Sequence, residues 1–141
     1  MLTRTEQTFI ERLRVGRLAT ADKKCAPHVV PVCFVYRVKN LYVAIDEKPK
    51  VGPPMALKRL RNIRENPQVS VVVDEYDEDW SRLGWVLFRG HAEILEKGDE
   101  HGQAQNLLRS RYPQLRKMTL DCLPVIAMRL TKVTSWGNLS S

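Results

Sequence analysis

The sequence predicts one domain over residues 1–141, mainly β with flanking helices and arranged as a small antiparallel barrel. Residues 17–46 alternate between β-branched runs and two turns, at 22–25 and 39–40, which is typical of a β-meander. Short helical patterns then interrupt the later strands, an order that favours a barrel over a doubly wound parallel sheet. The length suffices for one hydrophobic core, and the sequence has no linker or internal repeat.

The N-terminal helix is expected in the segment TRTEQTFIERLRVG. Apolar residues recur at helical spacing from Phe9 to Leu13, Thr3 or Thr5 is placed to cap the first turn, and Gly16 is expected to stop the helix. In the meander that follows, Pro31 lies inside a strand-like run. Because proline cannot donate a hydrogen bond to a neighbouring strand, this strand is expected at a sheet edge or locally distorted.

The second helix is expected in VGPPMALKRLRNIREN, where Leu57, Leu60 and Ile63 share one face and Asn66-Pro67 ends the helical stretch. The segments QVSVVVDEY and GWVLFRGHAEIL are predicted strands. A third helix is expected in GDEHGQAQNLLRSRYPQL, and LPVIAMRLTKVTSW is expected to be the closing strand. The predicted order is therefore helix, three strands, helix, two strands, helix, strand.

Positive charge is concentrated in one segment of a chain whose net charge is +7. Six cations and no acid lie between residues 48 and 64, namely Lys48, Lys50, Lys58, Arg59, Arg61 and Arg64. This imbalance predicts an anionic partner at one patch. A solvated helix back is the alternative, but cations at a helix start without balancing acids suit a phosphate better. No aromatic residues interleave with the cluster, so nucleic acid is not an expected partner.

Motifs for other chemistries are missing from the sequence. His28, His91 and His101 lack metal-ligand spacing, so no metal is expected, and GxSxG, GxGxxG and Walker patterns are absent. The acidic run DEYDEDW, with five acids in positions 74–79, lacks the glycine and terminal glutamate of an EF-hand and is interpreted as a solvated loop. The three tryptophans are expected in the core or at an intersubunit interface; they are Trp80, Trp85 and Trp136.

The three cysteines, Cys25, Cys33 and Cys122, lie far apart and favour reduced thiols over a disulfide framework. Cys33 lies in an apolar strand and is expected to be a small buried hydrophobe. A signal peptide and a long apolar run are both missing, so a cytoplasmic location without membrane association is expected.

Four segments carry a family resemblance: GRLATADKKCAPHVVPVCFVY, LYVAIDEKPK, LKRLRNIRENPQVSVVVDEYDEDWSRL and KVTSWG. Together they resemble the pyridoxamine phosphate oxidase-like split-barrel family, and most closely its small branch that uses the deazaflavin coenzyme F-420. The resemblance extends from Leu2 to about Gly137. It implies a six-stranded antiparallel split β-barrel that forms a homodimer, with two cofactor sites in the grooves between subunits.

The resemblance also implies where the cofactor, FMN or coenzyme F-420, would bind. Its ring would lie along the strand from His28 to Phe34, including Val30, Pro31 and Val32. Lys58 and Arg59 would hold the phosphate where oxidase members place Arg-Lys, with Arg61, Lys48 and Lys50 as further contacts. The closing strand with Trp136 would lie near the partner's cofactor.

Two departures from the oxidases bear on the activity. The flavin-contacting glutamine at the start of the fifth strand is replaced by Leu83-Gly84-Trp85, and the oxidases' extended C-terminus is missing after SWGNLSS. Vitamin B6 oxidation is therefore not expected. The expected activity is hydride transfer between the cofactor and a small conjugated substrate, since the cofactor itself supplies that chemistry. The alternative is a non-enzymatic FMN- or haem-binding protein, with His28 or His91 as the haem ligand.

Overall fold

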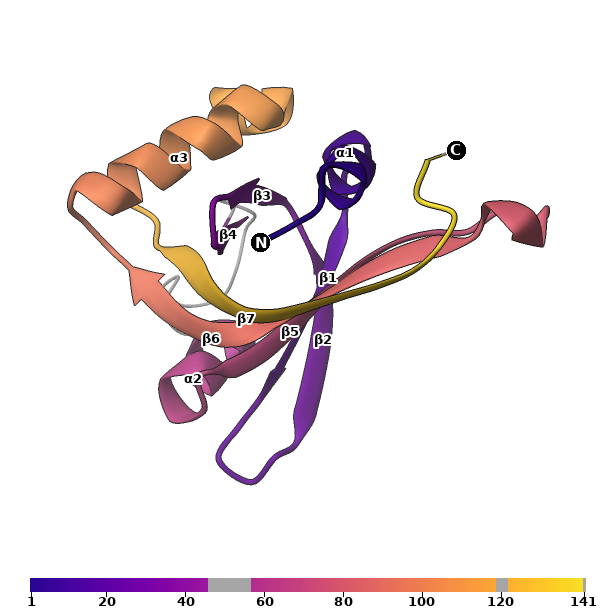
Figure 1. The fold of residues 1–141 in the computed structure, drawn as a ribbon. Helices are drawn as coiled ribbons and strands as arrows, with labels where there is room; N and C mark the ends of the chain where they lie inside the picture. The colour runs from indigo at the N-terminus through magenta and orange to yellow at the C-terminus, as the bar shows by residue number, and fades with distance from the viewer. Residues whose placement is uncertain (46–56, 119–121, 141) are drawn as a thin grey trace.

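The structure is a computed structural model that describes residues 1–45, 57–118 and 122–140. Its elements follow the order α1 (Arg4–Arg12), β1 (Gly16–Ala21), β2 (Pro27–Val32), β3 (Phe34–Arg37), β4 (Asn40–Ala44), α2 (Lys58–Glu65), β5 (Gln68–Glu75), η2 (Trp80–Arg82), β6 (Gly84–Leu95), α3 (Asp99–Arg111), η3 (Pro113–Lys117) and β7 (Val125–Gly137). The mainly β class with flanking helices is confirmed, and Figure 1 shows the helices around one strongly curved sheet.

The strands form a single antiparallel sheet in the order β2-β1-β5-β6-β7-β4-β3. β2 and β3 lie at opposite edges of this order, yet only Cys33 separates them in the chain. Two residues of extended chain span about 7 Å, so the two edges must approach each other at this corner. The sheet is therefore curled into a half-barrel.

The described residues contain seven strands where six were expected, because the predicted run around Pro31 is divided at Cys33. β2 pairs with β1 up to Val32, and β3 pairs with β4 from Phe34 onward. The expected edge position of the Pro31 strand is confirmed, since β2 pairs with β1 alone among the described strands. At a sheet edge, an extended segment can exchange one partner strand for another at little cost, because one of its sides needs no partner.

The first helix begins as predicted but ends earlier. Thr3 caps α1 in a capping box, in which its hydroxyl accepts from Glu6 N–H and the Glu6 carboxylate accepts from Thr3 N–H. The expectation that Gly16 stops the helix is wrong, because α1 ends at Arg12 and Gly16 is the first residue of β1. The guanidinium of Arg111, at the end of α3, donates to carbonyls in the last turn of α1 and so fixes that end.

The concave side of the sheet holds the main core. Phe9 and Ile10 of α1 and Leu60 and Ile63 of α2 pack there against inward-facing strand residues such as Phe88. A second cluster forms on the outer side, where α3 covers β4 and the start of β7. Of the helices within the described ranges, none is long and apolar enough to cross a membrane.

The rest of the outer side is not covered by any described element. We call it the open face, and it is made by outward side chains of β2, β1, β5, β6 and the last part of β7: Val29, Pro31, Arg17, Ala19, Ser70, Val72, Asp74, Trp85, Leu87, Arg89, Lys132 and Trp136. Its apolar members include Val29, which is 61% exposed, and Trp136, which is 53% exposed. An apolar sheet face of this kind marks a place for a ligand or partner.

Candidate functional site

The β2 residues expected to contact a cofactor ring divide between the two faces of the sheet. His28, Val30 and Val32 point inward, and Val32 is only 8% exposed, whereas Pro31 is exposed on the open face. Strand alternation imposes this division, because neighbouring side chains point to opposite sides. The side chains therefore do not share one ligand-facing surface, and what a ligand can reach along the whole of β2 is its backbone edge.

His28 lies next to a buried polar pair, Thr20 and Asn62, that connects β1 with α2. It is in register with Thr20 of β1, whose hydroxyl accepts from the amide of Asn62 at 3.0 Å. Asn62 is fully buried on α2. Two atoms here, His28 Nδ1 and Asn62 Oδ1, are buried without a hydrogen-bond partner among the described residues. Such atoms carry unused hydrogen-bonding capacity next to the basic helix.

The basic residues of α2 lie on the side of the helix that faces away from the core. Lys58, Arg61 and Arg64 are exposed and Arg59 is half-buried, while Leu60 and Ile63 face inward as predicted. Leu57 at the N-cap provides no side-chain cap for the first amide groups of the helix. The helix start thus combines cationic side chains with the positive end of the helix dipole. Lys48 and Lys50, the other two predicted phosphate contacts, lie outside the described residues.

Lys58 has one acidic neighbour that the sequence did not reveal. Its Nζ lies 3.8 Å from the carboxylate of Asp22 in the β1–β2 turn. That carboxylate also accepts from the N–H groups of Ala26 and Lys24, and these bonds, with the Ala26 bond the larger cause, lower the pKa of Asp22. The ion pair is long and partly solvated, so it leaves the Lys58 charge available to a ligand.

Trp136 lies at the opposite end of the sheet from α2. It stacks on Trp85 with 6.5 Å between ring centroids and 24° between planes. β5 begins two residues after the Asn66 cap of α2 and ends opposite Gly84, beside this pair, and its eight residues correspond to roughly 25 Å of strand. One chain therefore does not bring Trp136 and Lys58 into one site. The core alternative is wrong for Trp80 and Trp136, which are 71% and 53% exposed; the interface alternative stays a prediction.

The acidic run is only partly a solvated loop. Asp74 and Glu75 belong to β5, where Glu75 makes a bidentate ion pair with Arg12, at 2.7 and 2.9 Å, and Asp74 lies 2.8 Å from Arg17. The Arg12 guanidinium lowers the pKa of Glu75. Asp79 caps η2 by accepting from Ser81 N–H. These bonds fix one border of the open face.

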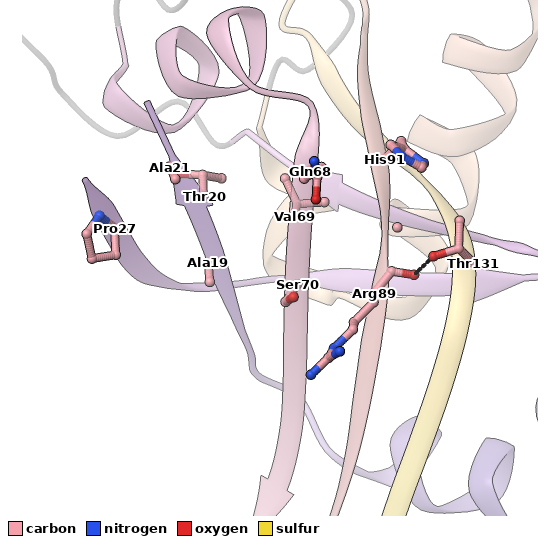
Figure 2. A pocket seen from close by; sticks show the side chains of 11 residues that line it. Ala19, Thr20, Ala21, Pro27, Gln68, Val69, Ser70, Arg89, His91 and Thr131 are labelled. Carbon is pink, nitrogen blue, oxygen red and sulfur yellow. Dashed lines mark hydrogen bonds between the residues drawn. The ribbon is translucent and has the colours of Figure 1, made fainter. Parts of the chain in front are cut away.

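Two hollows open on this face. One, of about 380 Å³, lies between Trp85, Leu87, Val72 and the Arg17–Asp74 ion pair. The other, of about 430 Å³, lies nearer α2, and Figure 2 shows its lining residues. They include Ala19, Ala21, Pro27, Ser70, Arg89, His91 and Thr131.

Sequence reasoning did not single out Arg89 or the hollow around it. The available signal was an arginine followed by glycine inside the otherwise regular strand GWVLFRGHAEIL, a pattern that indicates a bulge. Within residues 1–45, 57–118 and 122–140, no three His, Cys, Asp or Glu side chains form a group that could hold a metal ion. All three cysteines lie in these ranges and none forms a disulfide; Cys33 is half-buried against the outer cluster.

Solved structures with the same fold come from several bacteria. A conserved hypothetical protein of Mycobacterium tuberculosis is 20% identical with a TM-score of 0.77, over 97% of this chain and 86% of the other. HutZ, the heme storage protein of Vibrio cholerae, is 19% identical with a TM-score of 0.72, over 92% and 89%. The General Stress Protein 26 of Bacillus anthracis is 21% identical with a TM-score of 0.68, over 93% and 90%. At these identities the likeness concerns the fold.

The sequence itself identifies the family. No curated protein sequence matches the chain. A family model described as Pyridoxamine 5'-phosphate oxidase matches residues 2–137, which include both the curled sheet and the basic helix. The chain therefore belongs to the pyridoxamine 5'-phosphate oxidase (PNPOx_N) family.

Proposed function

We propose that the protein is a homodimeric oxidoreductase that binds FMN or coenzyme F-420 between α2 and the edge of β2. The observation that supports the proposal is the hydrogen bond from Asn62 to Thr20, which joins α2 to β1 next to His28, the register partner of Thr20 on β2. A phosphate at the helix start and a ring along the strand edge would then be held by neighbouring elements of one chain. Family membership supports a flavin-type cofactor.

The described residues fit a phosphorylated cofactor. Lys58, Arg59 and Arg61 would bind the phosphate by charge-assisted hydrogen bonds, together with the first amide groups of α2. When bound, the cofactor supplies hydride transfer to a small conjugated substrate, and the chain supplies orientation and charge. FMN and coenzyme F-420 each carry a flat tricyclic ring, a ribityl chain and a phosphate, so the proposal names both.

A second copy completes the proposed site. The Trp85–Trp136 stack is exposed on the open face, roughly 25 Å from the α2 end of the same sheet. In a two-fold dimer this stack can reach the cofactor of the partner, while each chain binds its own phosphate. No described strand pairs with the outer edge of β2, and the partner would cover that edge.

Charge-removal variants test the phosphate contact. Replacing Lys58 and Arg59 together by Gln is expected to weaken FMN or F-420 binding by roughly two to four decades, because each charge-assisted contact contributes about 1.5–3 kcal/mol and the two are not additive. Riboflavin has no phosphate, and its binding should change little. The matched control is the double change Lys23→Gln and Lys24→Gln, which removes the same charge from the nearby β1–β2 turn. Equal losses for FMN and riboflavin would refute the proposed role of α2.

Haem binding is the second candidate, and the position of His91 favours it. His91 lines the 430 Å³ hollow together with Arg89, which combines an axial ligand with a cation for propionates. HutZ, which shares the fold, is a heme storage protein. The absorption spectrum of the purified protein, followed by titration with haemin, separates the two candidates. Haem binding predicts a Soret band that His91→Ala abolishes, and flavin-type binding predicts none.

A further inference from the structure

The 430 Å³ hollow on the open face forms because several outward side chains of the sheet are small. Its floor consists of small residues on neighbouring strands, Ala19 and Ala21 of β1 and Ser70 of β5. Pro27 closes it on the β2 side. Larger outward residues at these positions would fill this volume.

A β-bulge shapes the other wall. The register of β6 against β7 shifts between Arg89 and Gly90, so Thr131 of β7 has no partner in the ladder. The Thr131 hydroxyl donates to the Arg89 carbonyl at 3.1 Å and replaces the missing ladder bond. At Gly90 a Cβ would lie 2.0 Å from the Arg129 carbonyl oxygen, so only glycine permits this approach of the two strands. Bulges are common next to functional sites, and this one borders the hollow.

Arg89 brings a positive charge to the hollow, and no other described lining residue carries a negative charge to balance it. Figure 2 shows its side chain extending from β6 toward β5, beside Ser70. None of the described residues that line the hollow is acidic. Two acids of β5 and β6 on the same outer side of the sheet are engaged with other arginines, Asp74 with Arg17 and Glu93 with Arg129. Within the described part of the chain, the Arg89 guanidinium has neither a hydrogen bond nor an ion pair.

We infer that this hollow is a binding site for a small organic carboxylate with a flat apolar body. The carboxylate would accept bidentate hydrogen bonds from Arg89 and a further one from Ser70 or His91, and the apolar body would lie on Ala19, Ala21 and Pro27. The inference is independent of the proposed cofactor site at α2, and it is an alternative to haem as the occupant of this hollow. Because the site is sunk into the sheet, a second copy covering the open face would enclose it.

Titration of the isotopically labelled full chain, without cofactor, tests the inference with benzoate as the probe. Benzoate is expected to bind in the millimolar range and to shift amide resonances of β1, β5 and β6, while benzamide, its neutral analogue, binds roughly tenfold more weakly or not at all. Arg89→Gln should weaken benzoate binding roughly tenfold or more. Ala19→Leu should abolish it by filling the floor while leaving every charge in place.

The control is Lys132→Gln, which removes the same charge from the register partner of Arg89 on β7, outside the lining of the hollow. This variant should bind benzoate like the unmodified protein. Three results would overturn the inference: no saturable shifts, equal affinity for benzoate and benzamide, or an equal loss in Arg89→Gln and Lys132→Gln. Resonance dispersion of each variant shows that it is folded, so a loss of binding cannot be attributed to unfolding.

Discussion

At the scale of single residues, one charged cluster connects α3 with the sheet. Arg129 of β7 makes two bonds to the carboxylate of Glu100, one of them 2.9 Å long, and its Nε donates to Glu93 at 2.8 Å. The Tyr42 hydroxyl donates to the same Glu100 carboxylate at 2.7 Å. Hydrogen bonds from Arg129 first, and from Tyr42 second, lower the pKa of Glu100 from 4.5 to about 2. The cluster therefore depends on an ionised Glu100.

The depressed pKa of Glu100 predicts a loss of stability in acid. A carboxyl whose pKa falls on folding contributes fully above its unfolded value, here 4.5, and that contribution is lost as the pH falls toward about 2. Both side chains are about one-third exposed, so solvent screening reduces the contribution to about 1–2 kcal/mol. Denaturant unfolding of Glu100→Gln should show a lower free energy of unfolding at pH 7 and a flatter pH dependence between these values.

Glu93→Gln is the matched control for this prediction. Glu93 contacts the same arginine but is 61% exposed, so its removal should cost clearly less. The prediction is wrong if both variants have the same free energy of unfolding and the same slope against pH.

At the scale of elements, α3 contains a helix-interior glycine. Gly102 is exposed within Asp99–Arg111, and a Cβ there would meet nothing within 4 Å. Gly98, the N-cap of the same helix, also has open space around it, but its φ is +100°. Both positions have room for a Cβ, but only Gly98 has a positive φ, so the two glycines form a matched pair for testing the effect of backbone conformation.

Gly102→Ala is expected to raise the free energy of unfolding by about 0.5–1 kcal/mol, because alanine loses less backbone entropy in a helix. Gly98→Ala should lower it by about 1–3 kcal/mol, since only glycine adopts this backbone region without strain. Thermal and denaturant unfolding of both variants measure the difference. Changes of the same sign in the two variants would contradict the argument.

Elements with complete local signals were predicted well from the sequence. The strand GWVLFRGHAEIL matches β6 in full, and the capping box at Thr3 marks the start of α1. The third helix was extended too far, because Pro113 ends α3 and begins the short η3. The break at Cys33 was missed for a physical reason: Val32 and Phe34 are both buried, so the alternation of apolar residues continues through the change of partner strand.

The candidate site was predictable where it depends on one element. In α2, the exposed cations and the inward residues Leu60 and Ile63 follow the periodicity of a single helix, which can be recognised in the sequence. The polar group at His28 and the hollow at Arg89 each need residues from three or more elements, and the hollow also needs a register shift between β6 and β7. Local periodicity carries no information about such combinations.

At the scale of the whole molecule, the open face is the feature that a single chain leaves unexplained. α1 and α2 fill the concave side and α3 covers part of the outer side, while no described element covers the outward residues of β2, β1, β5 and β6. Valine and tryptophan side chains are exposed on this face. Covering them with a second copy would be favourable, because it removes apolar surface from water. The exposed sheet face therefore supports the proposed dimer, in addition to the proposed need to enclose a cofactor.

Two exposed valines test where the second copy binds. Val29 is 61% exposed on the open face, and Val38 is 67% exposed at the β3–β4 turn, on the other edge of the sheet. Val29→Glu should convert the dimer to a monomer at micromolar concentration, because a dimer would bury two unpaired carboxylates at its interface. Val38→Glu makes the same chemical change and should leave the dimer intact. Sedimentation velocity measures both, with far-UV circular dichroism showing that each variant is folded.

Two outcomes would contradict this prediction. An unmodified protein that sediments as a monomer and still binds cofactor tightly would refute the dimer. Dissociation by Val38→Glu alone would place the interface at the opposite edge of the sheet.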